Sequence, residues 1–356
     1  MTRIAFSWNG LPQYAARLIH KAVDRLGEDC VVIGSRPTVP IEGMEEVLSC
    51  PILWVDFARP ARWSDLGLEV PEIFVQSGWG YPAFNSLGAE VKARGGRVIG
   101  LSDNNWRGDF RQMLIGAIAF RFLHRRRFDA MIVPGRQGQK LMRWFGMPKD
   151  RVRGGMYGAD PALFNGGDSL SSRPKTFLFV GQFIARKDVV GLANAFIRFV
   201  RSRPGWTLRL CGSGVQRSSI PEHENIVVED FVQPEQLVER LRQAQFLVLP
   251  SLSEAWGLVV HEAASCGCGL VLSNRIGSAD DLSTVVNSVC FTAGSEGDLL
   301  RALHEAADFD GARLLTAEKE SRRLAGAFGP DRFSREVEAL IRGFSQEAAK
   351  RGQCAN

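Results

Sequence analysis

The sequence predicts an α/β protein built from two doubly wound, parallel-sheet domains. Short runs rich in Val, Ile, Leu and Phe alternate with helical segments along all 356 residues. Such runs are typical of parallel strands that helices cover on both faces, and the length is sufficient for two ordinary cores. We expect strands at RIAFSW, CVVIGS, ILWVDF, EIFVQS, RVIGLS and DAMIVPG in the first domain, and at TFLFVG, TLRLCG, NIVVED, FLVLPS, GLVLSN and SVCFTA in the second.

The segment FNGGDSLSSRPK separates these two sets of strands. It is rich in Gly and Ser and contains a Pro near its end, a composition typical of a linker. We therefore expect domains over residues 1–165 and 174–332. Sheets of this kind bind ligands at the carboxyl ends of their strands, so we expect the two domains to face a shared cleft.

The composition excludes several classes of protein. With 45% hydrophobic and 23% charged residues, the chain does not resemble a disordered protein. No apolar stretch reaches about 18 residues, which argues against a membrane span. The first residues lack the apolar core of a signal peptide, and the seven cysteines have no regular spacing. We therefore expect a cytoplasmic protein with free thiols.

Two acidic residues, Glu254 and Glu262, lie eight positions apart in the stretch LVLPSLSEAWGLVVHEAASCG. The apolar run before them predicts a buried strand, and a helix is expected to begin near Trp256, with Ser251 or Ser253 as its N-cap. A strand, a tight turn and a helix N-terminus together form an anion site. Carboxylates beside such a site suit a ligand that carries both phosphate and hydroxyl groups. That combination describes a nucleotide-sugar.

These residues resemble the retaining glycosyltransferases of the GT-B fold, specifically family 4 with its E-x7-E motif. The resemblance covers the last half of the chain well, including TFLFVGQFIARKD, TLRLCGSG and PSLSEAWGLVVHEAASCGCGLVLS. The first half is similar only in general shape. The resemblance implies two Rossmann-like domains: 1–165 binds the acceptor and 174–332 binds the nucleotide-sugar donor. It also implies a last helix, about 333–356, that packs back on the first domain.

The family resemblance gives the two acids separate roles. It implies that Glu262 accepts hydrogen bonds from both ribose hydroxyls and that Glu254 lies near the donor sugar and its departing oxygen. The sugar and diphosphate would face a run of backbone amides, those of Trp256, Gly257, Leu258 and Val259. A plain structural alternative exists for Glu262, since an acid near a helix N-terminus stabilises the helix by about 0.3–1 kcal/mol.

A basic pair, Arg186 and Lys187, follows the strand TFLFVG. Negative charge grows on the β-phosphate as the glycosidic bond breaks, so a cation there stabilises the transition state more than the ground state. Lys187 matches the family lysine in position. The family arginine just after the glycine is Gln182 here, and we hypothesise that Arg186 compensates for it. A solvated basic loop is the alternative interpretation.

Several other positions of the second domain lie after predicted strands. The resemblance places the base of the nucleotide against backbone atoms of Phe231 and Val232, although both residues also suit a core. Gly181 and the turn Gly212-Ser213-Gly214 are expected either to contact phosphate or only to make turns.

The first domain offers weaker candidates. Gly10, in the first loop, is expected to open the site to the diphosphate. Asp103 and Asn104 end the strand RVIGLS, where family members contact the donor sugar or acceptor, so Asp103 is a candidate catalytic residue; a helix cap is the alternative. Residues 76–79 are a candidate site for the acceptor.

No metal or other cofactor is expected. Asp308-Phe309-Asp310 resembles the metal motif of another glycosyltransferase fold, but it lies at a helix end and is predicted to be a turn. His261-Glu262 begins like a zinc motif, yet position 265 is serine, so the zinc pair is missing. No Cys/His cluster has zinc spacing.

The segment 107–127 is strongly basic and also apolar. Residues 104–153 contain 12 Lys and Arg against 3 Asp and Glu. One interpretation is a helix that lies on anionic lipid headgroups or receives a phosphorylated acceptor. The other is a core helix with a solvated basic end. Both stay open. We do not expect nucleic-acid binding, because no aromatic platform is interleaved with the basic residues.

Together these observations predict an enzyme, a metal-independent retaining glycosyltransferase. The donor would be a nucleoside-diphosphate sugar, with UDP favoured over GDP, and the acceptor a hydroxyl of a glycan or lipid-linked molecule in polysaccharide biosynthesis. The location would be cytoplasmic, free or peripheral on the inner membrane face. The alternatives are a GT-B epimerase or phosphorylase, and an inactive nucleotide-sugar-binding protein.

Overall fold

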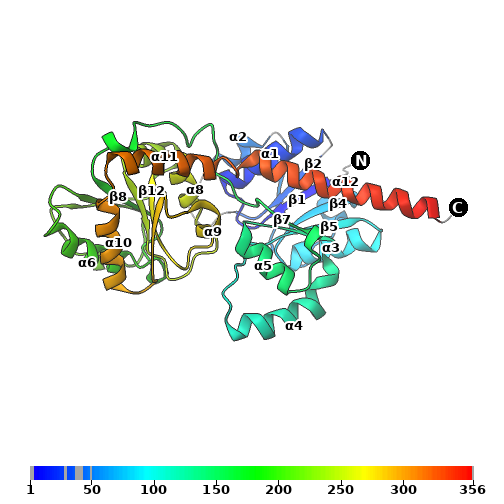
Figure 1. Ribbon diagram of the computed structural model, residues 1–356. Helices are drawn as coiled ribbons and strands as arrows, with labels where there is room; N and C mark the ends of the chain where they lie inside the picture. The colour runs from blue at the N-terminus through cyan, green and yellow to red at the C-terminus, as the bar shows by residue number, and fades with distance from the viewer. Residues whose placement is uncertain (1–3, 28–29, 37–42, 49, 355–356) are drawn as a thin grey trace. The chain divides into compact units, whose positions relative to one another are not determined.

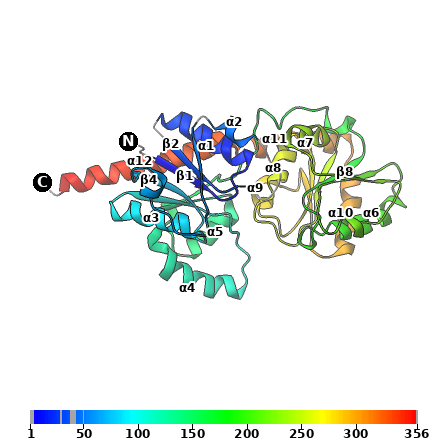
Figure 2. The same cartoon turned by 180° about the vertical axis from the view of Figure 1, so that it is seen from behind.

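The computed structural model describes residues 4–27, 30–36, 43–48 and 50–354. The chain divides into two compact units, the first formed by residues 1–158 and 328–356 and the second by residues 159–327 (Figure 1). Each unit is a parallel sheet with helices on both faces, seen from opposite sides in Figures 1 and 2. The predicted fold class, two Rossmann-like parallel-sheet domains, is confirmed.

The first unit contains a seven-stranded sheet in the order β3-β2-β1-β4-β5-β6-β7. All pairings are parallel. The order reverses between β1 and β4, and this switch point is where open parallel sheets bind ligands. The strands are β1 Ile4–Trp8, β2 Cys30–Gly34, β3 Ile52–Trp54, β4 Ile73–Ser77, β5 Arg97–Leu101, β6 Ala130–Val133 and β7 Val152–Gly154.

Helices cover both faces of this sheet because its strands are apolar on both sides. Along β1, Ile4, Phe6 and Trp8 belong to one buried cluster and Ala5 to another, as expected from the two-residue period of a strand. The helices are α1 Gln13–Leu26, α2 Met44–Val47, α3 Pro82–Ala93, α4 Ala117–Ala119, α5 Arg136–Trp144 and α12 Pro330–Cys354. The first cluster lies under α1 and α12, and the second under α3 and α5.

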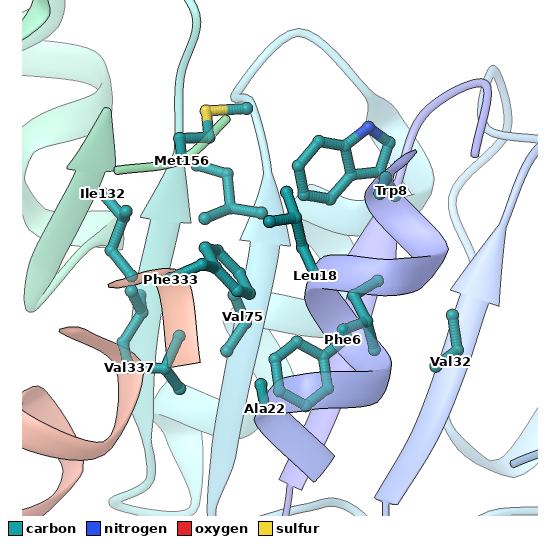
Figure 3. Close-up of a cluster of buried hydrophobic side chains, with 14 of the residues drawn as sticks. Phe6, Trp8, Leu18, Ala22, Val32, Val75, Ile132, Met156, Phe333 and Val337 are labelled. Atoms are coloured by element: carbon teal, nitrogen blue, oxygen red, sulfur yellow. The ribbon is translucent and has the colours of Figure 1, made fainter. Parts of the chain in front are cut away.

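The last helix, α12, completes the first cluster. Phe333 and Val337 are fully buried, and Figure 3 shows them beside Val75, Ile132 and Met156. The chain leaves this unit after Gly158 and returns just before α12. Backbones at the two crossings touch, since a Cβ on Gly158 would lie 2.2 Å from the Cα of Gly329.

The second unit repeats the same topology with six parallel strands in the order β10-β9-β8-β11-β12-β13. Its switch point lies between β8 and β11. The strands are β8 Thr176–Val180, β9 Thr207–Cys211, β10 Ile226–Glu229, β11 Phe246–Leu249, β12 Gly269–Ser273 and β13 Ser288–Phe291. The helices are α6 Val189–Val200, α7 Pro234–Arg242, α8 Leu258–Ser265, α9 Ala279–Leu282, α10 Glu296–Ala307 and α11 Gly311–Ala325.

The structure differs from the sequence-based expectation in three places. Strand β7 has only three residues and contains Arg153, so the sequence has no apolar run there that would predict a strand. The N-cap of α8 is Gly257, with a φ of 79°, so the expected serine cap is wrong. Residues 164–175, which have the composition of a linker, lie within the second unit. Leu170 and Arg173 in this segment are buried, and the Arg173 guanidinium donates to carbonyl oxygens of Leu241, Ala244 and Cys266.

The loops after β8 and β9 lie so close together that they exclude side chains. The N–H of Gly181 donates to the carbonyl oxygen of Cys211 over 3.0 Å, and the N–H of Phe183 to that of Ser213 over 2.7 Å. A Cβ on Gly212 would lie 1.9 Å from the carbonyl oxygen of Gly181. Gly212 is therefore required for this close approach.

We expect Gly212→Ala to lower the free energy of unfolding by about 2–3 kcal/mol, because the methyl group overlaps a backbone oxygen. Chemical denaturation of the purified protein measures this change. Gly297→Ala is the matched control, since a Cβ there meets nothing within 4 Å and alanine is favoured in a helix. Equal stability of the two variants would contradict the packing argument.

Candidate active site

The candidate site is formed by loops at the carboxyl edge of the second sheet. Strands β8 and β11 are neighbours, with Phe177 opposite Phe246, so the loops that follow them lie side by side at the switch point. The loop after β8 carries Arg186 and Lys187, and the loop after β11 carries Glu254. Lys187 and Arg186 precede Glu254 by 67 and 68 positions in the sequence, and the sheet brings the three residues together.

Glu254 accepts hydrogen bonds from both cations. The Lys187 ammonium donates to Glu254 Oε2, and each of the two side chains is only 12% exposed. The Arg186 guanidinium lies 3.4 Å from the same oxygen and donates to the carbonyl oxygen of Ser253 over 2.6 Å. The structure therefore groups three of the four predicted catalytic residues. It also puts Arg186 where a second cation is available beside Lys187, while Gln182 is exposed.

Backbone bonds hold Glu254 in place. Its N–H donates to the carbonyl oxygen of Arg275, and its own carbonyl oxygen accepts from Gly277, each over 3.1 Å. The N–H of Leu252 donates to the carbonyl oxygen of Arg186 over 2.8 Å. The loops after β8, β11 and β12 are thus joined into one structure before any ligand binds.

Helix α8 begins at Leu258, four residues after Glu254. Gly257 adopts a left-handed conformation, and a Cβ there would lie 3.2 Å from Cγ of Glu254. The predicted amide run, Trp256 to Val259, covers the last residues of the loop and the first turn of α8. Amides of a first helical turn have no acceptor within their own helix, so this end attracts negative charge. Trp256 is buried, and Leu258 and Val259 are partly buried.

Glu262 lies on α8, one turn beyond Leu258, and the residue as a whole is partly buried. No hydrogen bond or ion pair is formed to this carboxyl group within the described part of the chain. Removal from water raises its pKa from 4.5 to about 8. A desolvated carboxyl group without a partner is unfavourable in a purely structural role. It is suited to a ligand that brings its own hydroxyl groups.

The neighbouring histidine, His261, has a different role. Its Nδ1 accepts from the N–H of Ala159 over 2.8 Å, so Nε2 carries the proton and donates to the carbonyl oxygen of Ala325 over 3.0 Å. Burial lowers its pKa to about 4, which keeps the ring neutral. His261 therefore joins the first residue of the second unit to the end of α11, near the last residues of that unit, a role that the sequence did not indicate.

The remaining candidates of the second unit lie along the same sheet edge. Gly181 follows β8 and donates to the carbonyl oxygen of Cys211, the last residue of β9. Close packing of the two loops accounts for Gly212 and Gly214. Phe231 and Val232 follow the edge strand β10, and the Phe231 ring is 38% exposed. The structure leaves this ring available at the edge.

In the first unit, polar side chains gather at the switch point between β1 and β4. Asn9 donates to the hydroxyl of Tyr81 over 2.9 Å and accepts from Ser35 over 3.0 Å. The N–H of Gly10 donates to Ser35 Oγ over 2.7 Å, so that amide is already engaged. Gln76 is buried and donates to Gly78 and Asn85, which indicates that it shapes the loop.

Asp103 is exposed after β5, and the Tyr157 hydroxyl lies 3.4 Å from its Oδ2. Burial raises the pKa of Tyr157 well above its usual value, with Tyr14 and Asp103 as further causes. Sequence reasoning missed Tyr81, Tyr157 and Ser35. Tyr157 follows the unpredicted strand β7, so recognising that strand would have revealed it.

Within the described residues, no group of three or more His, Cys, Asp or Glu side chains is placed to hold an ion. Asp308 ends α10, and Asp310 caps α11 by accepting from the N–H of Arg313 over 2.8 Å. The predicted turn at Asp308-Phe309-Asp310 is confirmed.

Part of the chain matches a known protein family. Residues 174–308, which include Lys187, Glu254 and Glu262, match the family model described as glycosyl transferases group 1. These residues are called the group 1 domain here, after the family model that they match. The predicted resemblance to this family is confirmed for these residues, which make up the second unit except its first 15 and its last 19 residues.

Curated relatives match over part of their length. A D-inositol 3-phosphate glycosyltransferase from Acidothermus cellulolyticus is 30% identical over 217 residues, which is 54% of this chain and 46% of that protein. The chain thus spans about half the length of the curated relatives it matches.

Solved structures match over nearly the whole chain. Sucrose-phosphate synthase from Thermosynechococcus elongatus is similar with a TM-score of 0.70 and 16% identity, covering 97% of this chain and 99% of that one. Anabaena HepE in complex with UDP gives a TM-score of 0.73 and 12% identity, covering 96% and 100%. At these identities the likeness shows the fold.

The raised pKa of Glu262 predicts a pH-dependent stability. Between pH 4.5 and about 8 the unfolded carboxyl group ionises while the folded one keeps its proton, so the free energy of unfolding falls as pH rises. We expect Glu262→Gln to match the wild type at pH 4.5 and to exceed it by about 1–3 kcal/mol at pH 8. Chemical denaturation at the two pH values measures the difference.

The control for this prediction is Glu235→Gln on α7, where the side chain is exposed. Its effect is expected to be small at both pH values. A Glu262→Gln effect that stays constant with pH would show that the carboxyl group is not desolvated.

Proposed function

We propose that this protein is a retaining glycosyltransferase that uses a nucleoside-diphosphate sugar as donor. The observation that carries the proposal is the arrangement after β8 and β11: two cations on one carboxylate, a helix N-terminus, and the unpartnered carboxyl group of Glu262. A diphosphate requires cations and amides, and a ribose requires a hydrogen-bonding carboxyl group. This site lies within the group 1 domain.

In this proposal each side chain of the site has a defined role. Glu262 binds the ribose hydroxyls, with a proton available to donate as well as lone pairs to accept. The diphosphate replaces Glu254 as the partner of Lys187 and Arg186. Glu254 is then available to hydroxyls of the donor sugar. As the bond between the sugar and the β-phosphate oxygen breaks, Lys187 and Arg186 stabilise the growing charge on that oxygen.

The leaving phosphate oxygen then accepts the proton of the attacking hydroxyl on the same face of the sugar, so the anomeric configuration is retained. In this scheme the two cations and the amides of α8 do the work of a metal ion, and activity persists in a chelator. UDP is the favoured nucleotide. The acceptor is a hydroxyl of a glycan or lipid-linked molecule, and Asp103 is its candidate contact.

The proposal predicts different effects for two variants. Lys187→Ala is expected to lower the rate of nucleotide release from donor sugars by about 100-fold or more while weakening nucleotide binding less, because its interaction strengthens in the transition state. Glu262→Ala is expected to weaken nucleotide binding by about tenfold or more. Thermal shift with UDP, GDP, ADP and TDP measures binding, and nucleoside-diphosphate release from the matching sugars measures turnover.

Lys319→Ala and Glu235→Ala are the matched controls, since both side chains are exposed on helices of the same unit. No thermal shift with any nucleotide would overturn the donor site. A shift without turnover for any donor and acceptor would favour an inactive nucleotide-sugar-binding protein. Turnover that yields an epimer or a sugar phosphate would instead identify an epimerase or a phosphorylase.

A further inference from the structure

An amphipathic helix at the periphery of the first unit is not used by the proposed reaction. This segment, residues 110–127, is called the basic helix here, and its middle part, Ala117–Ala119, carries the label α4 in Figures 1 and 2. Most of its turns are wide, over Arg111–Gly116 and Phe120–His124, with three α-helical residues between them and one narrow turn, Arg125–Arg127, at the end. Runs of wide turns are rare in proteins and occur frequently at functional sites.

The wide turns explain a pattern of period four. Large apolar side chains recur at Phe110, Leu114, Ile118 and Phe122. An α-helix has 3.6 residues per turn and a π-helix has more, so a mixture of the two keeps positions four apart on one face. The sequence and the backbone therefore agree on a single apolar stripe.

The inner face of the basic helix is firmly attached to the unit. Gln112 is buried and donates to the carbonyl oxygen of Asn105 over 2.6 Å. Phe120 is also buried and stacks on Phe145 with ring centroids 5.2 Å apart. The indole of Trp144 donates to the carbonyl oxygen of Met113 over 2.8 Å. The helix is thus held by one face, and the interpretation as a core helix with a solvated basic end describes this inner face alone.

The outer face leaves its apolar side chains in water. Phe110 is 74% exposed and Phe122 is 81% exposed. Four more large apolar residues of the helix are exposed: Leu114, Ile115, Ile118 and Leu123. The indole of Trp144 is 42% exposed. Contiguous apolar surface of this kind on a soluble fold marks an interaction site.

The charge of the helix indicates the kind of partner. Asp109 is the one acidic residue in 107–127, and it is paired with Arg107. Arg111 and Arg126 are exposed and have no hydrogen-bond or ion-pair partner within the described chain. A cavity of about 320 Å³ at the end of the helix is lined by five cations and two carboxylates: Lys92, Arg97, Arg125, Arg126, Arg151, Asp129 and Glu347.

We propose that the outer face of the basic helix docks on the surface of an anionic lipid bilayer. The apolar stripe would enter the boundary between headgroups and acyl chains, and the arginines would contact lipid phosphates. A second copy of the chain is a poorer partner, because a symmetric contact would bring two strongly basic surfaces together. Among the described residues no helix is long and apolar enough to cross a membrane, so the contact lies on the surface.

Docking on this surface does not depend on the proposed activity. Together with that activity, however, it indicates the kind of acceptor. The basic helix follows Asp103 and Asn104 after a short loop, so the site at the carboxyl edge of the first sheet would lie close to the bilayer. Provided that the proposed function holds, the acceptor would then be a hydroxyl carried by a lipid anchor. This arrangement would bring that hydroxyl to the enzyme along the membrane plane.

The test is co-sedimentation of the full chain with vesicles, either phosphatidylcholine alone or a mixture with phosphatidylglycerol, at low and physiological salt. The wild type is expected to bind the anionic vesicles and not the neutral ones. The double variant Phe110→Ser/Phe122→Ser and the double variant Arg111→Gln/Arg126→Gln are each expected to weaken binding by about tenfold or more. All four side chains are exposed, so the fold is retained, and circular dichroism verifies this.

Two double variants of the second unit are the matched controls. Val215→Ser/Val285→Ser removes two exposed apolar side chains, and Arg201→Gln/Lys319→Gln removes two exposed charges. Both are expected to bind like the wild type. No binding of the wild type to anionic vesicles would overturn the proposal. Binding that is insensitive to the Phe110 and Phe122 changes would also overturn it, because that result describes adsorption by charge alone.

Light scattering tests the remaining alternative, that the outer face of the basic helix binds a second copy of the chain. If the wild type is an oligomer that Phe110→Ser/Phe122→Ser converts to a monomer, the surface is an interface between copies and the lipid proposal fails. Nucleotide thermal shifts are measured on the same variants. They are expected to be unchanged, so failure of membrane binding and failure of the donor site are separate results.

Discussion

The ion pair between Lys187 and Glu254 is the constraint around which the candidate site is organised. It connects the loops after β8 and β11, the two strands at the switch point of the second sheet. Both side chains are largely removed from water, so either charge alone would be unfavourable. The pair holds a cation at the position where a diphosphate is expected, and holds it before the ligand arrives. Such preorganisation avoids the cost of ordering these groups during the reaction.

The sequence was sufficient for most of the fold and for the central part of the site. Apolar runs identified the strands because both faces of each sheet are buried, and strand order placed the loops of Lys187 and Glu254 together. The start of α8 was predicted less accurately. Serine is the commoner N-cap, but the turn after Glu254 requires a left-handed residue, and Gly257 fills that position. The segment with Leu170 and Arg173 resembled a linker by composition, although its packing comes from residues distant in the sequence.

The parts that could not be predicted depend on contacts between distant segments. The hydrogen bonds among Asn9, Ser35 and Tyr81 arise because three loops meet at one sheet edge, and no local pattern indicates this. The two interpretations of the basic helix could not be separated by its composition. Exposure of Phe110 and Phe122 follows from wide helical turns and from the attachment of the opposite face, and both features are properties of the folded unit.

The discontinuity of the first unit has a consequence for synthesis of the chain. Its core includes Phe333 and Val337 from α12, which the ribosome makes only after residues 159–327. The second unit is continuous, and His261 joins its two ends through Ala159 and Ala325. Because domains fold as units while the chain emerges, the second unit can close its core first. Until α12 arrives, the apolar side of α1 lacks its cover. The unit that begins the chain is therefore the last to be completed.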